Sequence, residues 1–175
     1  MSYPVAANEA QRLAGLRNLH ILDTAAELPF DTLTAIARQH FATPFVAISL
    51  VEEQRQWFKS HPGLGACETH RDVAFCNYTI MSDAVFEVTD AATDPTFQAN
   101  PLVTADPHIR YYCGAPILVR GHRLGAFCVI DRVARPAMSD GDRQVLQGLA
   151  FLTAHILATH RELRESASAL VALLK

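Results

Sequence analysis

The chain has 175 residues, of which 50% are hydrophobic and 19% are charged, and its formal net charge is -3. These values predict a folded domain with a substantial core, alone or with a long helix attached, and exclude a disordered chain. Lysine and arginine are too scattered for a nucleic-acid partner, no apolar run approaches the roughly 18 residues of a membrane span, and no signal peptide is recognisable.

Two amphipathic helices are predicted in the N-terminal part, over residues 8–22 and 30–41. The dipeptide Thr43-Pro44 ends the second helix, because proline cannot continue it. The apolar, β-branched run at residues 45–51 predicts a strand that is buried on both faces. Residues 55–61 have mixed polarity and predict a second strand nearer the edge of the sheet.

The middle of the chain is rich in loops. Thr69 and Asp72 stand three residues apart ahead of an apolar run, which predicts a capped short helix over residues 71–81. Residues 85–90 predict another strand, and Asp94-Pro95 predicts a single helical turn after it. Long loops in a compact domain often carry function, so we expect site residues in this part.

A long hairpin is predicted from two apolar strands, at residues 110–119 and 123–131. In the expected register, Cys113 lies opposite Ile130 and diagonal to Cys128 on the same face. Both faces of the hairpin are apolar, so we expect helices to cover one face and loops or a ligand to cover the other.

A long final helix is predicted to begin near Ser139 and to reach the end of the chain. Along this helix, apolar residues recur every seven positions at Leu149, Ile156, Leu163 and Leu170. A single apolar position per heptad is weak evidence for a coiled coil. We expect a single domain over residues 1–160, with residues 161–175 as a helical extension for signalling or dimerisation.

Six sequence words in order resemble those of a GAF domain: LHILDTAAELPFD, VAISLVEEQRQWFKS, THRDVAFCNYTI, VTDAATDPTFQANPLV, IRYYCGAPI and GHRLGAFCVID. The chain is similar to the GAF domains found ahead of histidine kinases and diguanylate cyclases in bacterial signalling proteins. The resemblance implies an α+β fold with a central antiparallel sheet of five or six strands. N- and C-terminal helices would cover one face of this sheet, and short helices and loops would form a pocket on the other.

The resemblance also implies which side chains line the pocket. Most are aromatic, hydroxyl or amide side chains with few charges, as is typical of small-molecule sites. The candidate ligand-binding residues are Phe75, Cys76, Tyr78, Thr79, Asp94, Phe97, Asn100, Tyr111, Tyr112 and Cys113. A second interpretation is that these side chains fill the space themselves, with Asp94 and Asn100 only capping turns.

The tripeptide Ala-Phe-Cys occurs twice, ending at Cys76 and at Cys128. A buried cysteine more often packs as a small hydrophobic residue than reacts, and we expect this of Cys128 in its strand. Cys76 belongs to the short helix that would wall the pocket, so it faces either a pocket or a filled core. Four cysteines in a domain of this size do not form a disulfide framework, which favours a reducing, cytoplasmic location.

Free methionine-(R)-sulfoxide reductases are enzymes that resemble a small GAF domain with several redox cysteines. The spacing of Cys67 and Cys76 is similar to that of two of those cysteines. The third position differs, because Cys113 already lies within its strand instead of in the loop before it. This departure counts against the enzyme, and we expect no catalytic residue.

Cofactor attachment is not expected either. A bilin tether in photoreceptor GAF domains is commonly a cysteine followed by histidine, whereas Asn77 follows Cys76 here. His61, Cys67 and His70 are too irregularly spaced for a structural zinc site. We therefore expect no metal, haem or bilin.

The leading interpretation is a non-enzymatic sensory domain that binds an unidentified small molecule. By the family resemblance, the N- and C-terminal helices would form a homodimer and relay the signal to a histidine kinase or diguanylate cyclase output domain. Two alternatives stay open. One is a thiol-dependent reductase similar to free methionine-(R)-sulfoxide reductase, and the other is a dimerisation module without a ligand.

Overall fold

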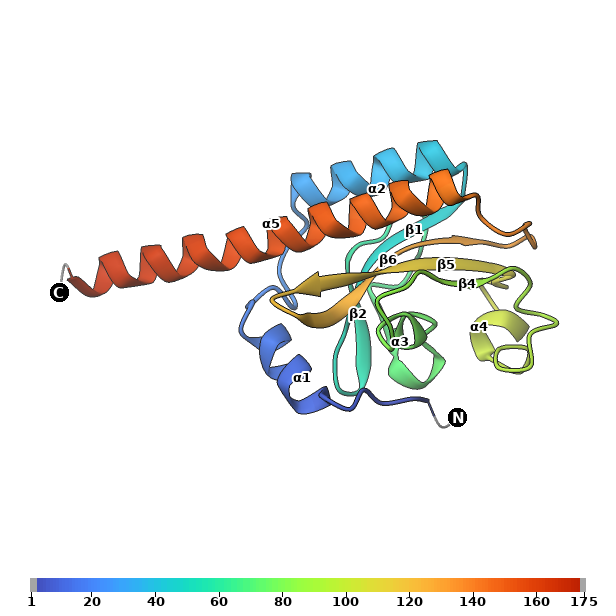
Figure 1. Cartoon of the computed structure of the whole chain (residues 1–175), viewed down its shortest axis with the longest axis horizontal. Coiled ribbons are helices and arrows are strands. Elements are labelled where there is room, and N and C mark those ends of the chain that lie inside the picture. The colour runs from blue at the N-terminus through green and yellow to red at the C-terminus, as the bar shows by residue number, and fades with distance from the viewer. Residues whose placement is uncertain (1–2, 174–175) are drawn as a thin grey trace.

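The computed structural model describes the backbone of residues 3–173 and the side chains of residues 3–160. In this part of the chain, six strands form one antiparallel sheet with the order β3-β2-β1-β6-β5-β4 (Figure 1). The strands are β1 (Phe45–Val51), β2 (Arg55–Ser60), β3 (Glu68–His70), β4 (Phe86–Val88), β5 (Tyr111–Val119) and β6 (His122–Asp131). The predicted α+β class and antiparallel sheet are therefore confirmed.

Helices lie on both faces of the sheet, the long ones on one side and the short ones on the other (Figure 1). They are α1 (Glu9–Arg17), α2 (Leu28–Phe41), the 3-10 turn η1 (Arg71–Val73), α3 (Cys76–Thr79), α4 (Pro101–Thr104) and α5 (Asp140–Leu173). α2 and α5 run side by side over one face. α1 packs against β6 at the end of the sheet, so α2 is the N-terminal helix that shares a face with α5.

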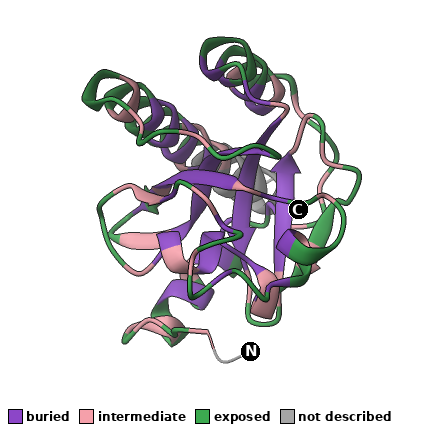
Figure 2. Cartoon of the chain, turned by 90° about the vertical axis from the view of Figure 1, so that its right-hand side faces the viewer, coloured by how far each residue is buried: buried purple, intermediate pink, exposed green. Residues whose placement is uncertain are grey.

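The two faces of the sheet bury separate hydrophobic clusters. On the side of the long helices, Phe30 of α2 and Leu146 of α5 pack in the same cluster as Ile48 of β1. On the opposite side, Phe97 and Tyr112 belong to a second cluster beneath the short helices. All seven residues of β1 are buried, as predicted for a strand covered on both faces (Figure 2).

The first predicted helix is shorter than expected, because α1 ends at Arg17 instead of residue 22. The chain then turns twice, with positive φ angles at His20 and Asp23. These turns carry Leu19 and Ile21 into the cluster beneath the long helices, although neither is helical. Tertiary burial therefore overrides the helical periodicity here.

The segment 71–81 is also less regular than the predicted single helix. It consists of η1, an extended residue at Ala74, and the short helix α3. The Asp72 amide donates to the ring of His70, so the cap comes from His70 and not from Thr69. The interruption lets Arg71 reach Asn77, whose side-chain oxygen accepts a hydrogen bond of 2.7 Å from the guanidinium.

The register of the predicted hairpin is wrong by one residue over most of its length. The structure pairs Gly114 with Cys128 and Cys113 with Val129, which puts Cys113 and Cys128 on opposite faces. Two features produce the difference: a turn in which Arg120 and Gly121 both have positive φ angles, and a register shift between Ile117 and Leu118 that separates the two cysteines. Such a two-residue turn closes directly between β5 and β6, whereas the prediction assumed a four-residue loop.

α5 is a single helix of 34 residues that projects beyond the sheet (Figure 1). Leu149, the first member of the predicted seven-residue repeat, is buried in the cluster beneath the long helices. The side chains of Leu163 and Leu170 lie outside the described residues, and the division at residue 160 stays a prediction. Among the described residues, no helix is both long enough and apolar enough to cross a membrane.

Candidate functional site

A cavity of about 270 Å³ lies on the sheet face opposite α2 and α5. Its floor is formed by β1, β2, β5 and β6, and its walls by α3, α4 and the loops that flank them. The lining residues outside the predicted set are Phe45, Gln56, Phe58, Gly63, Leu64, Gly65, Ala66, Thr69, Leu102, Asp106, Pro107, Ile109, Ile130 and Arg132. Most of these side chains are apolar, as in small-molecule pockets generally.

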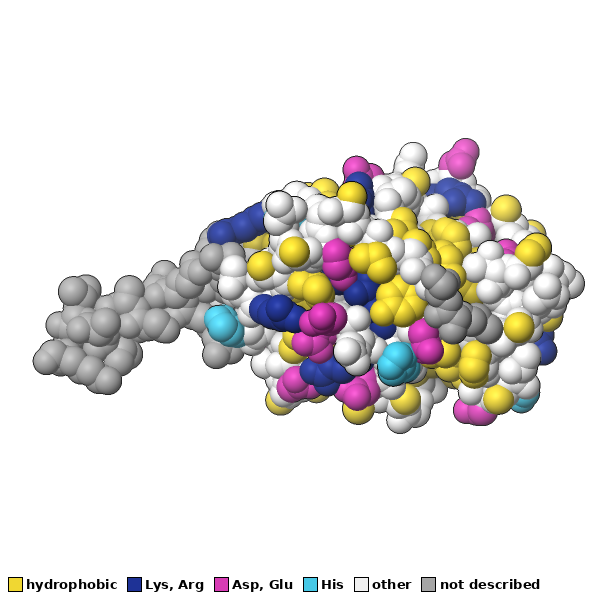
Figure 3. All heavy atoms as spheres, turned by 90° about the horizontal axis from the view of Figure 1, so that it is seen from below, with side chains coloured by type: hydrophobic (Ala, Val, Ile, Leu, Met, Phe, Trp, Pro, Cys, Tyr) yellow, Lys and Arg dark blue, Asp and Glu magenta, His cyan; other side chains and the backbone are white. Residues whose placement is uncertain are grey.

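The charged groups of the cavity belong to its rim. The Arg132 guanidinium lies over the Phe45 ring at 5.0 Å, donates to the Pro107 carbonyl at 2.9 Å, and is 3.5 Å from Asp106. Deeper in, the Gln56 amide donates to the Thr69 hydroxyl at 2.8 Å. Figure 3 shows this side of the molecule, where hydrophobic side chains are intermixed with charges of both signs. The arrangement suits a small ligand with an apolar body and a hydrogen-bonding end.

One wall of the cavity depends on a glycine. Gly63 has a φ angle of +91°, and a side chain there would collide with the Pro44 carbonyl and come within 2.9 Å of the Phe45 ring. The loop after β2 therefore lies directly against the start of β1, where it closes one side of the cavity.

Three of the ten predicted site residues line the cavity: Phe75, Cys76 and Tyr112. Four more lie near them without lining it: Tyr78, Thr79, Phe97 and Asn100. Phe97 stacks on Phe75 with ring centroids 4.1 Å apart, so aromatic side chains fill part of the space that a larger pocket would need.

The remaining three predicted residues lie elsewhere. Asp94 accepts a hydrogen bond from the Thr96 amide at 2.8 Å, and Asn100 similarly caps α4 by accepting from the Leu102 amide. Tyr111 and Cys113 face the long helices and belong to the other hydrophobic cluster. Both placements follow from local geometry, the first from turn capping and the second from the alternation of side chains along β5, where Tyr112 faces the cavity and its two neighbours face away.

The lining residues that the sequence analysis missed come from β1, β2, β3, β6 and α4, and from the segments after β2, α4 and β6. Phe45 and Ile130 could be assigned to strands buried on both faces, and Phe58 to a strand nearer the sheet edge, but the sequence did not indicate which face carried the cavity. Strand alternation would have placed Phe45 and Ala47 on one face, and only the position of the long helices decides which face that is.

The two Ala-Phe-Cys sequences meet beneath the cavity. The sulfur atoms of Cys76 and Cys128 are 3.8 Å apart, and both side chains are buried. The Tyr112 hydroxyl donates to Cys76 Sγ at 3.3 Å and lies 2.7 Å from the Thr79 hydroxyl. Cys128, expected to be inert packing, therefore has a second thiol as its direct neighbour.

The pKa values of Cys76, Cys128 and Tyr112 are shifted in different directions. Burial opposes ionisation of Cys76, but hydrogen bonds from Cys128, Ser49 and Tyr112 outweigh burial and lower its pKa. The hydrogen bond with Cys76, together with burial, raises the pKa of Cys128 well above its ordinary value. Burial and the nearby thiols also raise the pKa of Tyr112, so its hydroxyl keeps its proton and acts as a donor.

The other two cysteines, Cys67 and Cys113, have different surroundings from this pair. Cys67 is exposed, and Cys113 contacts the Met138 sulfur at 3.7 Å on the side of the long helices. Burial and the neighbouring Glu87 carboxylate raise the pKa of Cys113 to about 12. Cys113 and Cys76 therefore belong to opposite faces of the sheet.

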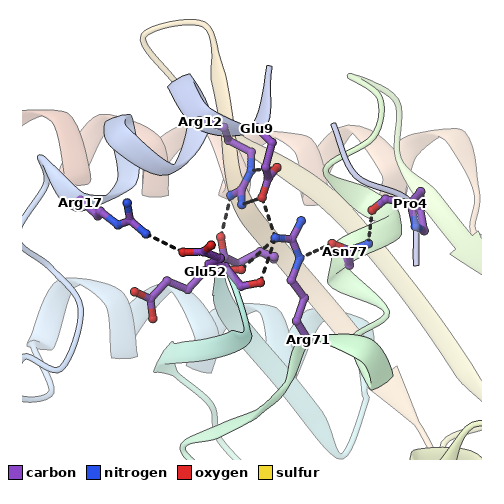
Figure 4. Close-up of polar contacts among 9 residues, drawn as sticks. Pro4, Glu9, Arg12, Arg17, Glu52, Arg71 and Asn77 are labelled. Atoms are coloured by element: carbon purple, nitrogen blue, oxygen red, sulfur yellow. Dashed lines mark hydrogen bonds and ion pairs between the residues drawn. The ribbon is translucent and has the colours of Figure 1, made fainter. Parts of the chain in front are cut away.

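A buried charge network ties α3 to the N-terminal segment (Figure 4). Arg71, with only 2% of its surface exposed, donates to Asn77 Oδ1 at 2.7 Å and to Glu9 Oε1 at 2.6 Å. Asn77 in turn donates to the Pro4 carbonyl at 2.8 Å, and Arg12 donates to both oxygens of Glu9. The helix that bears Cys76 is thus linked through side chains to the beginning of the chain.

The same network lowers the pKa of the Glu9 carboxylate. Burial opposes ionisation of Glu9, but hydrogen bonds from Arg12 and Arg71 outweigh it and lower the pKa of Glu9 to about 2. Glu9 therefore remains ionised throughout the physiological range.

Comparison with known proteins gives a family and several relatives. The sequence model of the GAF domain matches residues 26–157. A cyclic di-GMP phosphodiesterase of Pseudomonas aeruginosa is 40% identical over 150 residues, which are 85% of this chain and 26% of that protein. The chain thus spans about a quarter of the length of this relative.

Two solved structures share the fold at low sequence identity. The PixJ GAF domain of Thermosynechococcus elongatus, in its blue-light-absorbing form, superimposes with a TM-score of 0.65 at 12% identity, covering 93% of this chain and 96% of that one. Free methionine-R-sulfoxide reductase of Neisseria meningitidis gives 0.61 at 14% identity, covering 95% and 98%. The family match spans most of the described fold, including the sheet and the cavity, and the chain belongs to the GAF domain family.

Proposed function

We propose that this chain is a non-enzymatic sensory domain that binds a small molecule in the cavity. The observation that carries the proposal is the apolar cavity of about 270 Å³ between the sheet and the short helices. Its walls come from several loops, which can move at lower cost than strands when a ligand enters. The volume is close to the lower end of the range of about 300–1,000 Å³ typical of drug-sized ligands, so we expect a small ligand.

The ligand is expected to be amphipathic. Phe58, Ile109 and Ile130 offer apolar surface, while the Gln56–Thr69 pair and the rim guanidinium of Arg132 offer hydrogen-bonding partners. A ligand with a small ring or branched alkyl body and one polar or anionic end would use both sets of groups.

The output of the domain is proposed from the curated relative. Because the chain is 40% identical to part of a cyclic di-GMP phosphodiesterase, we expect it to regulate an enzyme of cyclic di-GMP turnover. This class of output includes the diguanylate cyclases expected from the sequence and is favoured over a histidine kinase. The proposal concerns regulation, so it assigns no catalytic residue to this chain.

The relay is proposed to use a homodimer formed by the long helices. Large hydrophobic side chains are exposed on α2 and α5, including Leu28 with 79% and Phe151 with 70% of their surfaces exposed. Ile36, Val145 and Leu152 add to this surface, and Figure 2 shows the outward sides of both helices exposed. If α2 and α5 packed against the same helices of a second copy, this apolar surface would be buried.

A thermal-shift screen of nucleotides, amino acids and small aromatic acids tests ligand binding. A ligand at 100 times its dissociation constant should stabilise the protein by about 2.7 kcal/mol. Gly65→Leu should abolish this stabilisation, because Gly65 lines the cavity and a side chain there meets open space. Ala92→Leu, at an exposed turn outside the cavity, is the control and should respond as the unmodified protein does. A stabilising ligand that is unaffected by Gly65→Leu would place the binding site elsewhere.

A further inference from the structure

We propose that Cys76 and Cys128 are a redox-active thiol pair, which small hydroperoxides entering through the cavity oxidise to a disulfide. The proposal goes beyond reversible ligand binding, because it makes the site beneath the cavity a point of covalent modification. Its basis is the distance of 3.8 Å between the two sulfur atoms, which come from different elements, α3 and β6.

The geometry requires only a small movement. A disulfide bond is about 2.05 Å long, so the two sulfur atoms, now 3.8 Å apart, must approach each other by about 1.8 Å. No side chain separates them, since they are within contact distance in the same hydrophobic cluster. Because α3 is short and flanked by irregular segments, it can move towards the sheet more readily than β6, which is paired on both sides.

The environment gives the two thiols different roles. Cys76 lines the cavity, so a small uncharged oxidant can reach it, whereas Cys128 does not line the cavity. The Tyr112 hydroxyl, held by Thr79, donates to Cys76 Sγ and favours its thiolate. The pKa of Cys76 is lowered and that of Cys128 is raised, which agrees with Cys76 as the attacking thiol and Cys128 as the resolving thiol.

The reaction is balanced in two steps with a hydroperoxide as the oxidant. Cys76 loses its thiol proton, its thiolate attacks one peroxide oxygen and the O–O bond breaks. Cys76 becomes a sulfenic acid, and the other oxygen takes up the released proton and leaves as water or an alcohol. The Cys128 sulfur then attacks the Cys76 sulfur, an S–S bond forms, and the sulfenic oxygen leaves as water with the Cys128 proton. The two thiols together lose two electrons, and the peroxide gains them.

Oxidation would also affect the contacts that hold the N-terminal segment. Asn77 follows Cys76 directly and holds both Arg71 and the Pro4 carbonyl. Drawing α3 towards the sheet would strain these contacts, so the disulfide could bias the position of the N-terminal segment as well as the shape of the cavity.

The test treats the folded protein with hydrogen peroxide, blocks the remaining thiols after denaturation and maps the peptides by mass spectrometry. We expect a peptide pair that joins Cys76 to Cys128 and weighs two hydrogen atoms less, and we expect dithiothreitol to reverse it. Cys67→Ser and Cys113→Ser are the matched controls and should retain the linkage. Oxidation confined to Cys67, with Cys76 and Cys128 still free in the folded protein, would overturn the proposal.

Two further variants separate the roles of the thiols. In Cys128→Ser, the sulfenic acid at Cys76 should persist and react with dimedone. In Cys76→Ser, Cys128 should stay unmodified, because it lacks access to the cavity. If the variants fold poorly, peptide mapping of the unmodified protein still decides the question. Because that mapping involves no added ligand, its result is independent of the thermal-shift screen for ligand binding.

Discussion

Tyr112 is the residue that joins the cavity to the buried thiols. Its ring lines the cavity and stacks near Phe75 at 5.3 Å, while its hydroxyl contacts Thr79 and Cys76. The family resemblance identified Phe75, Cys76 and Tyr112 as pocket residues, and the structure brings them together at the cavity. It could not identify the pairing of Cys76 with Cys128, because the two residues are 52 positions apart and only the packing of α3 on β6 brings them together.

A glycine beside this group gives the first prediction. A side chain at Gly114 would collide with the Tyr112 hydroxyl and come within 2.9 Å of Thr79 Oγ1. Gly114→Ala should therefore reduce the free energy of unfolding by about 1–3 kcal/mol, measured by urea denaturation. Gly148→Ala is the matched control. Because open space surrounds Gly148 within α5, that change should stabilise the protein by roughly 0.5–1 kcal/mol. Equal effects of the two changes would contradict the packing around Tyr112.

The titration of Glu9 gives a prediction about pH. The pKa of Glu9 is about 2 in the folded protein and 4.5 ordinarily, so its ionised form stabilises the fold above about pH 4.5. This contribution is lost progressively as the pH falls from about 4.5 towards 2. Glu9→Gln should cost about 2 kcal/mol of unfolding free energy at neutral pH, from the lost charged hydrogen bonds to Arg12 and Arg71. The difference from the unmodified protein should shrink across that acid range.

Glu53 is the control for this measurement, because its ion pair with Arg17 is exposed. Exposed pairs contribute little, so Glu53→Gln should change the unfolding free energy by less than about 1 kcal/mol at any pH. A pH dependence of stability that Glu9→Gln leaves unaltered would show that other carboxylates dominate acid unfolding.

At the scale of elements, the sequence was informative where periodicity and burial agree. The strand at residues 45–51 and the helix at 30–41 match β1 and α2 within two residues, because both have hard boundaries and strong apolar patterns. The sequence did not predict the elements whose formation depends on tertiary contacts. β3 has only three residues and alternates exposed with half-buried positions, so it exists through its pairing with β2. The break within residues 71–81 brings Arg71 to Asn77, a side-chain contact that periodicity does not predict.

The exposed apolar side chains of the long helices predict the oligomeric state. If α2 and α5 form the dimer interface, Phe151→Glu should place a charge in it and shift the protein to monomer in sedimentation velocity. Gln98→Glu adds the same charge at an exposed position in the turn ahead of α4 and should leave the dimer intact. A strict monomer for the unmodified protein at high concentration, or a dimer that survives Phe151→Glu, would contradict this interface.

At the scale of the whole molecule, the sheet separates two layers of different character. The α2 and α5 side buries a close-packed cluster and exposes apolar helix surface, whereas the other side carries the cavity, the thiol pair and the network that holds the N-terminal segment. Hydrogen bonds link α3 to α1 through Asn77, Arg71 and Glu9. This chain of contacts could not be predicted from the sequence, because Arg71 and Glu9 are 62 positions apart.

The central claim is that the cavity binds a small molecule, and a methyl NMR titration with a ligand from the thermal-shift screen tests it most directly. Ile109 and Ile130 line the cavity, so their methyl signals should shift most at low ligand concentration, and Gly65→Leu should weaken the titration. Tight binding that leaves the Ile109 and Ile130 signals in place, while shifting methyl groups outside the cavity, would contradict the account.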